Sequence, residues 1–382
     1  MIRVGIIWFL FLLSLLTVLK APAYSLWLVS IVVTEFPWIF IVVTMFLLVW
    51  GMGVNKYQLA GAIPGVIALI LFCTPIVRAY NVAGDLKPRF EAIFGAGSTI
   101  VKNRSIKEPF RFFKMLAGIG EKLAPHQVLI YDTEHNLALD YYHTKFPGNR
   151  PTIVVVHGGS WSSGNSSELP ELNTHLFKVG YNVASINYRL VPKYQNPAPV
   201  QDIHNAIVYL KDHADELEID TTNFILLGRS AGGQIALLAA YTLNEPGVKA
   251  VISYYAPADM VWGYSIPSNP LIMDSQKVMS DYLGGPYKSV PKNYEASSPI
   301  LAVNKNSIPT LLIHGQNDVL VAYEHSRRLN IKLQQLGVKH FLLTLPWATH
   351  GCDYTLNGPS GQLATYTVDR FINRMTNKQW TR

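Results

Sequence analysis

A serine between two glycines marks the segment Gly228–Gly232, which lies between an apolar stretch and a helical pattern. A sharp turn from a strand into a helix gives such a serine a strained backbone and an exposed hydroxyl. Glycine fits the crowded flanking positions because it lacks a Cβ atom, and the start of the helix favours developing negative charge. We therefore predict that Ser230 is a nucleophile; a plain glycine-rich turn is the alternative.

A glycine-rich loop, His157–Trp161, follows a run of valines 73 residues before this serine. When a nucleophile attacks a carbonyl group, the oxygen becomes an oxyanion that backbone N–H groups can stabilise. A loop after an early strand supplies such groups in proteins with this type of turn. The predicted oxyanion hole consists of the N–H groups of Gly159, Ser160 and Ala231. The imidazole of His157 is expected to hold the loop rather than to transfer protons.

An acid and a histidine are expected to follow the nucleophile in that order along the chain. Asp318 ends an apolar stretch 88 residues after Ser230, and His350 follows the last predicted strand 32 residues later. In such a triad the histidine removes the proton from the serine, and the carboxylate orients the imidazole and stabilises its charged form. We therefore assign His350 as the general base and Asp318 as its partner.

Other side chains compete for these roles. Asp259 follows the strand that ends at residue 254, so it is an alternative acid. His325 and His340 lie within a predicted helix and at the start of a strand, where they are poorly placed for catalysis. His314 is expected to be structural. Cys352 lies close to the predicted base but is not on a sharp strand-to-helix turn, so it is a weak candidate nucleophile.

Short apolar strands alternate with helical patterns from residue 126 onwards. The predicted strands are His126–Tyr131, Leu137–His143, Thr152–Val156, Asn182–Ile186, Phe224–Leu227, Val248–Tyr254, Thr310–Ile313 and His340–Leu345. The predicted helices are Glu171–Val179, Val200–Asp215, Ala231–Leu243, Tyr323–Leu336 and Gln362–Met375. This order predicts an α/β domain over residues 126–382, with a mostly parallel sheet flanked by helices. The alternation lapses over residues 256–308, which we interpret as a possible lid insertion.

Taken together, these motifs resemble the α/β-hydrolase superfamily over residues 126–375. The likeness is to its esterase and lipase branch, which includes hormone-sensitive-lipase-like carboxylesterases and bacterial carbohydrate-esterase-like hydrolases. The matching segments are His157–Trp161, Asn187–Pro192, Gly228–Gly233, His314–Asp318 and His350–Gly351. The resemblance implies a Ser-His-Asp triad, with Tyr188–Leu190 and Asp202 as scaffold around it. Two positions depart from the pattern: Arg229, where lipase-like relatives often have an acid, and Ser160, where glycine is frequent.

The resemblance implies a serine hydrolase that cleaves carboxylic esters through an acyl-enzyme. The same triad can cleave amides, so an amidase, arylformamidase or peptidase is one alternative. A non-catalytic binding protein on a hydrolase fold is another. The expected substrate is a small-molecule or lipid ester. No cofactor or metal ion is expected, because the sequence has no His-x-x-x-His or paired-Cys ligand spacing. The oligomeric state is left open.

Charged residues are scarce at the start of this chain of 382 residues. Residues 1–80 contain five of them, although charged residues make up 15% of the whole sequence. Three apolar runs, 4–19, 25–50 and 59–77, approach or exceed the roughly 20 residues that a spanning helix needs. We predict a multi-pass membrane anchor of about three transmembrane helices over residues 1–80. The middle run is either one kinked span or a span preceded by an interfacial piece.

Alternatives exist for several parts of this anchor. The first run can be a signal peptide cleaved after Ala23, although Pro22 disfavours cleavage. Glu35 is expected near an interface or facing other helices; the alternative is a functional carboxylate within the membrane. Two basic residues on one side and four on the other favour a cytoplasmic catalytic domain. One miscounted span would reverse this orientation, so the side is left open.

A basic segment connects the anchor to the α/β domain over residues 81–125. Positions 85–122 hold eight Lys or Arg residues and four acids. Apolar residues between 112 and 123 recur at helical spacing and predict an amphipathic helix. Such a helix contacts either anionic headgroups or the domain surface. Because the basic residues cluster beside the anchor, the net charge of +7 does not indicate nucleic-acid binding. The α/β domain is expected to need nothing from residues 1–80 for activity.

Overall fold

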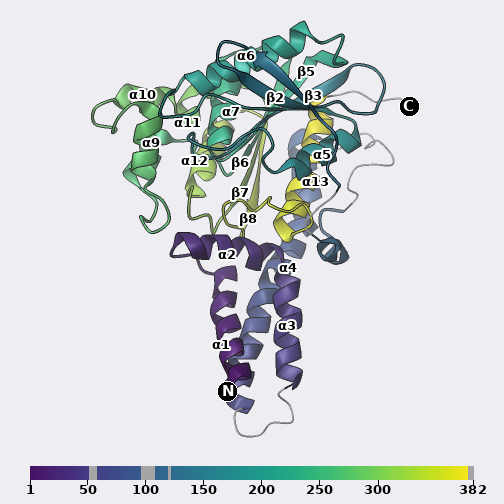
Figure 1. Cartoon of the computed structure of the whole chain (residues 1–382), viewed down its shortest axis with the longest axis vertical. Helices are drawn as coiled ribbons and strands as arrows, with labels where there is room; N and C mark the ends of the chain where they lie inside the picture. The colour runs from purple at the N-terminus through teal and green to yellow at the C-terminus, as the bar shows by residue number, and fades with distance from the viewer. Residues whose placement is uncertain (51–57, 96–107, 119–121, 377–382) are drawn as a thin grey trace.

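The structure, a computed structural model, describes residues 1–50, 58–95, 108–118 and 122–376. It has a head, formed by the residues from 122 onwards, and a helical stem beneath it (Figure 1). The stem consists of α1 (Ile2–Ser14), α3 (Pro37–Trp50) and the first half of α4 (Gln58–Phe94). α2 (Tyr24–Glu35) lies across the top of the stem, directly below the head (Figure 1).

A mixed sheet of eight strands forms the centre of the head, in the order β1-β2-β4-β3-β5-β6-β7-β8. β2 pairs antiparallel with both of its neighbours, whereas all pairs from β4 to β8 are parallel. The strands are β1 (Gln127–Asp132), β2 (Leu137–Tyr142), β3 (Arg150–Val156), β4 (Asn182–Ile186), β5 (Ile219–Arg229), β6 (Val248–Tyr254), β7 (Thr310–Gly315) and β8 (His340–Leu345). β3 and β4 are buried along their whole length, as parallel strands covered on both faces must be.

Helices cover both faces of this sheet. One face packs against α6 (Ala198–Asp212), α7 (Ala231–Thr242) and α12 (Glu324–Gln335); the other packs against α5 (Pro170–Val179), α13 (Pro359–Thr376) and the end of α4. Along β3, Val154 and Val156 belong to the first cluster, and Ile153 and Val155 belong to the second. This division follows from the alternation of side chains along a strand.

The strand–helix series predicted from the sequence is confirmed, because each predicted strand and helix of the head overlaps an observed element. β5 starts earlier than predicted, at Ile219. Between β6 and β7, where the alternation lapses, the chain forms four short helices: α8 (Met260–Ser265), α9 (Ser275–Leu283), α10 (Pro291–Ala296) and α11 (Pro299–Ala302).

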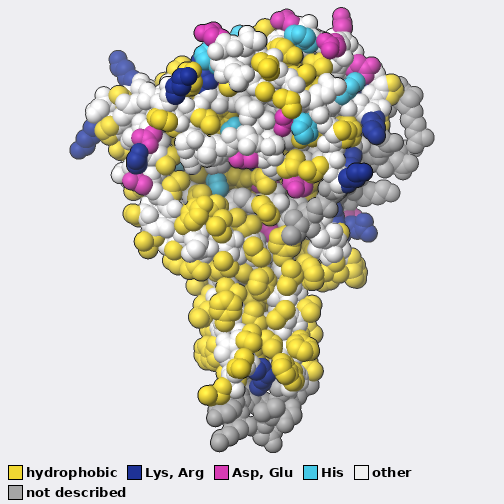
Figure 2. Space-filling model, viewed as in Figure 1, with side chains coloured by type: hydrophobic (Ala, Val, Ile, Leu, Met, Phe, Trp, Pro, Cys, Tyr) yellow, Lys and Arg dark blue, Asp and Glu magenta, His cyan; other side chains and the backbone are white. Residues whose placement is uncertain are grey.

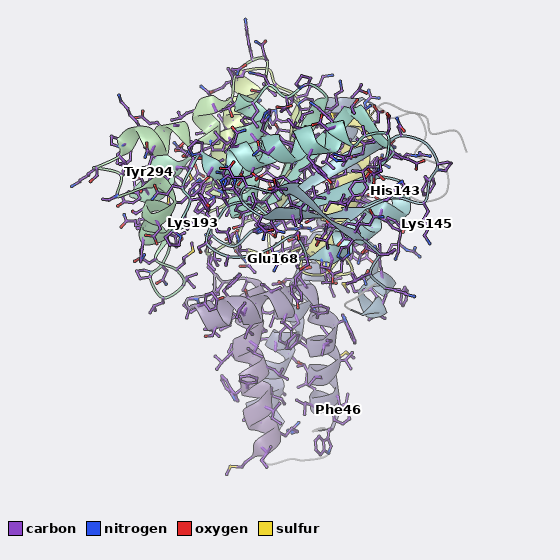
Figure 3. All side chains as sticks on the ribbon, turned by 45° about the horizontal axis from the view of Figure 1, so that its top comes forward. Phe46, His143, Lys145, Glu168, Lys193 and Tyr294 are labelled. Carbon is purple, nitrogen blue, oxygen red and sulfur yellow. The ribbon has the colours of Figure 1, made fainter. Side chains whose placement is uncertain are left out.

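The stem is apolar both inside and outside. Ile7, Leu47 and Phe72 are buried between its helices. Phe46 on α3 is 64% exposed and points away from the stem (Figure 3), and hydrophobic side chains cover the visible stem surface (Figure 2). Among the described residues, Ala60–Phe94 is the one helix long and apolar enough to cross a membrane, by length and composition. α2 and α3 pass this test only as a pair, and they are bent by 83°.

The middle apolar run therefore forms two helices that meet at Pro37. Proline lacks a backbone N–H and often begins a helix, as it does here for α3. Glu35, at the end of α2, is buried, and its Oε2 atom accepts a hydrogen bond of 3.1 Å from the backbone N–H of Ser360. The Glu35 carboxylate thus contacts the start of α13 in the head.

The structure differs from the sequence prediction at the end of the anchor. α4 runs as one helix through residue 80, and its second half packs against the head. The ring centroids of Phe90 and Phe341 are 5.6 Å apart. The boundary expected at residue 80 thus falls inside a helix. Of the amphipathic helix expected after residue 111, the structure has the 3-10 helix η3 (Phe112–Ala117); Ile119, part of that pattern, lies outside the described residues.

Candidate active site

Ser230 lies on the sharp turn between β5 and α7. Its φ of 52° and ψ of −120° are a strained backbone conformation for a residue with a side chain. Both flanking glycines are required by close contacts. A Cβ atom at Gly228 would lie 2.2 Å from the Gly232 carbonyl oxygen, and one at Gly232 would lie 2.1 Å from the His157 carbonyl oxygen. A side chain at either position would collide with the backbone. The turn at Ser230 can therefore form only because both positions are glycine.

The structure brings Ser230, His350 and Asp318 together, although they lie in three separate loops. His350 Nε2 is 2.9 Å from Ser230 Oγ, and His350 Nδ1 is 2.7 Å from Asp318 Oδ2. With the proton on Nδ1, the imidazole donates to the carboxylate and accepts from the serine hydroxyl. This arrangement suits the removal of a proton from the serine.

The Asp318 carboxylate is fully buried and accepts several hydrogen bonds. Its Oδ1 atom accepts hydrogen bonds of 2.9 Å from the N–H groups of Leu320 and Val321, and His314 Nε2 lies 3.2 Å from Oδ2. Burial alone would raise the pKa of Asp318, but the interactions with His350 and His314 outweigh it and hold this pKa well below its usual range. The carboxylate therefore stays ionised at neutral pH and can stabilise a charged imidazole.

The glycine-rich loop after β3 lies against the serine turn. A Cβ atom at Gly158 would lie 3.5 Å from Ser230 Cβ. Ser160 and Ala231 line the same cavity as Ser230, and Ala231 is the first residue of α7. Gly159 precedes Ser160 and has a φ of 104°. Of the predicted oxyanion hole, Ser160 and Ala231 thus line the same cavity as the serine, and Gly159 is adjacent to Ser160 in the loop after β3.

His157, at the start of this loop, is held by contacts with Tyr188 and Gly158. Its ring stacks on Tyr188 with centroids 4.3 Å apart, and the Tyr188 hydroxyl donates to the His157 and Gly158 carbonyl oxygens. Burial lowers the pKa of His157 to about 4, so the imidazole is neutral at pH 7. Its Nδ1 atom lies 2.7 Å from the Gly158 carbonyl oxygen. These contacts suit a residue that holds the loop.

The competing side chains are engaged elsewhere. Asp259 caps α8 by accepting a hydrogen bond from Trp262 N, and its Oδ2 atom is 2.9 Å from Arg328 Nη2. His325 is buried beside Trp262, and burial lowers the pKa of its imidazole to about 3. Cys352 is buried, which raises the pKa of its thiol. Within the described part of the chain, no group of three or more His, Cys, Asp or Glu side chains is arranged to hold a metal ion.

A buried ion pair links the serine turn to the histidine loop, and the sequence analysis did not identify it. Arg229 Nε donates to Asp353 Oδ2 at 2.5 Å, and the Tyr255 hydroxyl donates to Asp353 Oδ1. The Tyr255 ring lies 4.4 Å from the His350 ring between centroids. Arg229 itself was the sequence signal for this ion pair. It stands where lipase-like relatives often have an acid, and a buried cation needs an anion nearby.

The histidine loop also contacts α2, below the head. The indole N–H of Trp27 donates to the backbone carbonyl oxygen of His350 at 3.0 Å, and Gly351 packs beside Ile31. The head is therefore not structurally separate from residues 1–80, because α2 contacts the loop that carries the predicted base. No pattern around Trp27 signals this contact, because a tryptophan in an apolar run is equally typical of a membrane helix.

Comparison with known proteins gives consistent results. A family model described as BD-FAE matches residues 139–333, which are 195 of the 382 residues. Two curated relatives from Mycobacterium tuberculosis are "Esterase LipC", 27% identical over 241 residues, and "Esterase LipQ", 27% identical over 237 residues. These alignments cover 59% and 58% of this chain but only 58% and 55% of the two relatives. The chain thus spans little more than half the length of those proteins.

A solved structure also matches. An esterase from Pyrobaculum calidifontis aligns with a TM-score of 0.59 and 22% identity, covering 68% of this chain and 88% of that one. At this identity the likeness shows the fold alone, a mixed sheet flanked by helices as in α/β-hydrolases. The family model, by contrast, extends from β2 through the serine turn to α12, over more than half of the sequence. This chain therefore belongs to the BD-FAE family.

Proposed function

We propose that this protein is a membrane-anchored serine hydrolase that cleaves carboxylic esters. One observation carries the proposal: Ser230, on a strained turn, is the first member of a hydrogen-bonded series that continues through His350 to Asp318. The names of the two mycobacterial relatives support an ester as the substrate.

In the proposed reaction, Ser230 Oγ attacks the carbonyl carbon of the ester while its proton passes to His350 Nε2. Asp318 remains ionised and stabilises the imidazolium. The carbon–oxygen bond to the alcohol breaks, and the alcohol leaves with the proton from His350. Water then attacks the acyl-enzyme and gives its proton to His350. The bond to Ser230 breaks, the carboxylic acid is released, and the serine recovers its proton.

The oxyanion that forms at each attack needs hydrogen-bond donors. We assign this role to the N–H groups of Gly159 and Ser160, in the loop after β3, and of Ala231, which follows Ser230. Donors of this kind act because they are oriented before the reaction begins. Gly159 and Ser160 have positive φ angles, 104° and 53°, so the backbone of this loop turns in a conformation that is uncommon for residues other than glycine.

We infer that the anchor is multi-pass, with α1, α3 and α4 crossing the membrane. The support is the apolar outer surface of the stem, because side chains such as Phe46 would otherwise face water. Among the helices that the structure describes, α4 is the one long enough by itself; α1 and α3 are shorter and pack against it. The full-length protein should stay in the membrane fraction after an alkaline carbonate wash. Recovery in the soluble fraction would contradict the inference.

The activity is tested with a panel of p-nitrophenyl esters of rising chain length and a p-nitroanilide control. The wild-type protein is expected to hydrolyse esters in preference to the anilide. Ser230→Ala should lower ester hydrolysis by at least about 10³-fold while the fold persists, as loss of a triad member does. A residual rate near that of the wild type would refute Ser230 as nucleophile. Preference for the anilide would instead indicate an amidase.

A further inference from the structure

An apolar cavity of about 420 Å³ lies beside Ser230. Its lining includes Ser160, Ser230 and Ala231 from the head and residues 20–22, which lie between α1 and α2. The remaining wall is largely apolar and includes Ile272, Met273 and Val278 from the segment between β6 and β7. The volume is within the range of small-molecule sites, about 300–1,000 Å³.

The chemistry of the wall indicates what the cavity can hold. Besides the exposed Lys20, the charged group in the described lining is Asp318, whose carboxylate is already bonded to His350. His325 also lines the cavity, and its buried imidazole is neutral at pH 7. A hydrocarbon chain can occupy such a cavity without leaving a buried polar group unpaired.

The cavity lies where the stem meets the head. The backbone N–H of Tyr24 donates to the Leu271 carbonyl oxygen at 3.0 Å, and Asn269 Nδ2 donates to the Pro22 carbonyl oxygen at 3.1 Å. These bonds join the α1–α2 connection to the segment between β6 and β7. Both segments line the cavity, so the cavity lies at the junction between stem and head.

The surface at this junction is apolar and continuous with the stem. Ile266 and Leu271 are 57% and 70% exposed, and hydrophobic side chains extend from the stem onto the lower edge of the head (Figure 2). Lys20 is exposed beside the cavity; a lysine there can place its ammonium group among lipid headgroups while its stem covers apolar surface. The membrane that holds the stem would thus meet the entrance of the cavity.

We propose that this cavity takes the hydrocarbon chain of a lipid ester that enters from the membrane along residues 20–22. The proposal rests on the proposed ester hydrolysis at Ser230 and assigns its substrate class: an amphiphilic ester with a long hydrocarbon chain. The chain lies against Ala21, Ile272 and Val278, which brings the ester carbonyl to Ser230. The anchor is then part of the substrate site and determines specificity.

The test uses the full-length protein in phosphatidylcholine vesicles, with p-nitrophenyl palmitate in the vesicles and p-nitrophenyl acetate in the water. Ala21→Phe should fill the cavity and lower the ratio of palmitate to acetate hydrolysis by at least about tenfold, because a filled pocket excludes the longer chain. Val278→Phe fills it from the segment between β6 and β7 and should have the same effect. Ala23→Phe is the matched control: it lies in the same connection but outside the cavity wall, and the ratio should stay at the wild-type value.

Each hydrolysis rate is divided by the concentration of active sites, measured by titration with a small fluorophosphonate. Misfolded protein is thereby excluded from the comparison. If both cavity variants keep the wild-type ratio, or if wild-type protein hydrolyses acetate but not palmitate, the proposal is overturned. If acetate hydrolysis is absent or independent of Ser230, the proposed ester hydrolysis itself fails.

A second arm identifies the route of entry. Palmitate ester is placed either in the same vesicles as the protein or in separate ones. The proposal predicts hydrolysis at least about tenfold faster in the same vesicles, because the hydrocarbon chain cannot cross water readily. Equal rates would mean that the ester arrives through water and would overturn entry from the membrane.

Discussion

The two loops that meet at the reactive centre are supported in different ways. The serine turn is fixed by contacts within the motif and with the loop after β3, where glycines at 228 and 232 permit close backbone packing. The histidine loop is held by side chains that are distant in sequence: Trp27 bonds to the His350 carbonyl oxygen, and Arg229 bonds to Asp353.

The two sides of the centre therefore differ in how far they depend on residues that are close in the sequence. The motif itself signals the turn at the nucleophile: Gly228 is crowded by Gly232 within the motif, and Gly232 is crowded by the backbone at the end of β3. The position of the base depends on the tertiary fold, including a helix from the amino-terminal segment. Changes to the histidine side should therefore reveal contributions that no local motif contains.

The largest effect on the histidine side is expected from Asp318→Asn. This change removes the buried charge that stabilises the imidazolium, so kcat for p-nitrophenyl acetate should fall by about 10⁴-fold, as in comparable triads. Asp259→Asn is the control, because Asp259 is bonded to Arg328 and Trp262 instead. If Asp259→Asn lowered kcat more than Asp318→Asn, the acid would be Asp259 and the assignment of Asp318 as the partner of His350 would be wrong.

A moderate effect is expected from Trp27→Phe, which removes one hydrogen bond to the histidine loop. A bond worth about 1 kcal/mol corresponds to roughly fivefold in rate, and we expect this loss in kcat with KM unchanged. Trp38→Phe is a matched control, since the indole N–H of Trp38 has no hydrogen-bond partner among the described residues. Equal kcat values for both variants would show that α2 does not position His350.

A further effect, on stability rather than on rate, concerns the acid sensitivity of the serine side. Burial lowers the pKa of His157 to about 4 from the ordinary 6.5, so the unfolded chain binds more protons between these values. The stabilisation is complete above pH 6.5 and is lost as the pH falls towards 4. Between pH 7 and 5 the loss is about 2 kcal/mol.

Urea unfolding of the full-length protein in detergent at the two pH values measures this loss. His157→Gln should reduce the difference in stability between pH 7 and pH 5 by a similar amount. If the variant keeps the full pH dependence of the wild type, His157 is not the buried neutral group that supports the loop.

The sequence predicted most of the head well because its short strands are apolar and alternate with helical patterns. The alternation of strands and helices depends on burial on both faces of the sheet, which leaves a strong signal in each strand. The residues that meet at the reactive centre were also predicted, since Ser230, Asp318 and His350 each follow a strand that ends at the same edge of the sheet.

The sequence could not predict contacts between distant segments. Trp27 looks like any aromatic residue of a membrane helix, so its bond to His350 depends on how α2 docks on the head. The contribution of residues 20–22 to the cavity lining likewise depends on how the amino-terminal helices dock on the head. The continuation of α4 beyond residue 80 was missed because its charged residues face outward while Leu86 and Phe90 pack inward.

The central claim is that His350 activates Ser230 as the nucleophile. It is tested most directly by treating the full-length protein with a fluorophosphonate and locating the label by peptide mass spectrometry. We expect one label, on Ser230, and a labelling rate at least about 100-fold lower in His350→Ala. A label on another residue, or an undiminished rate in His350→Ala, would contradict it.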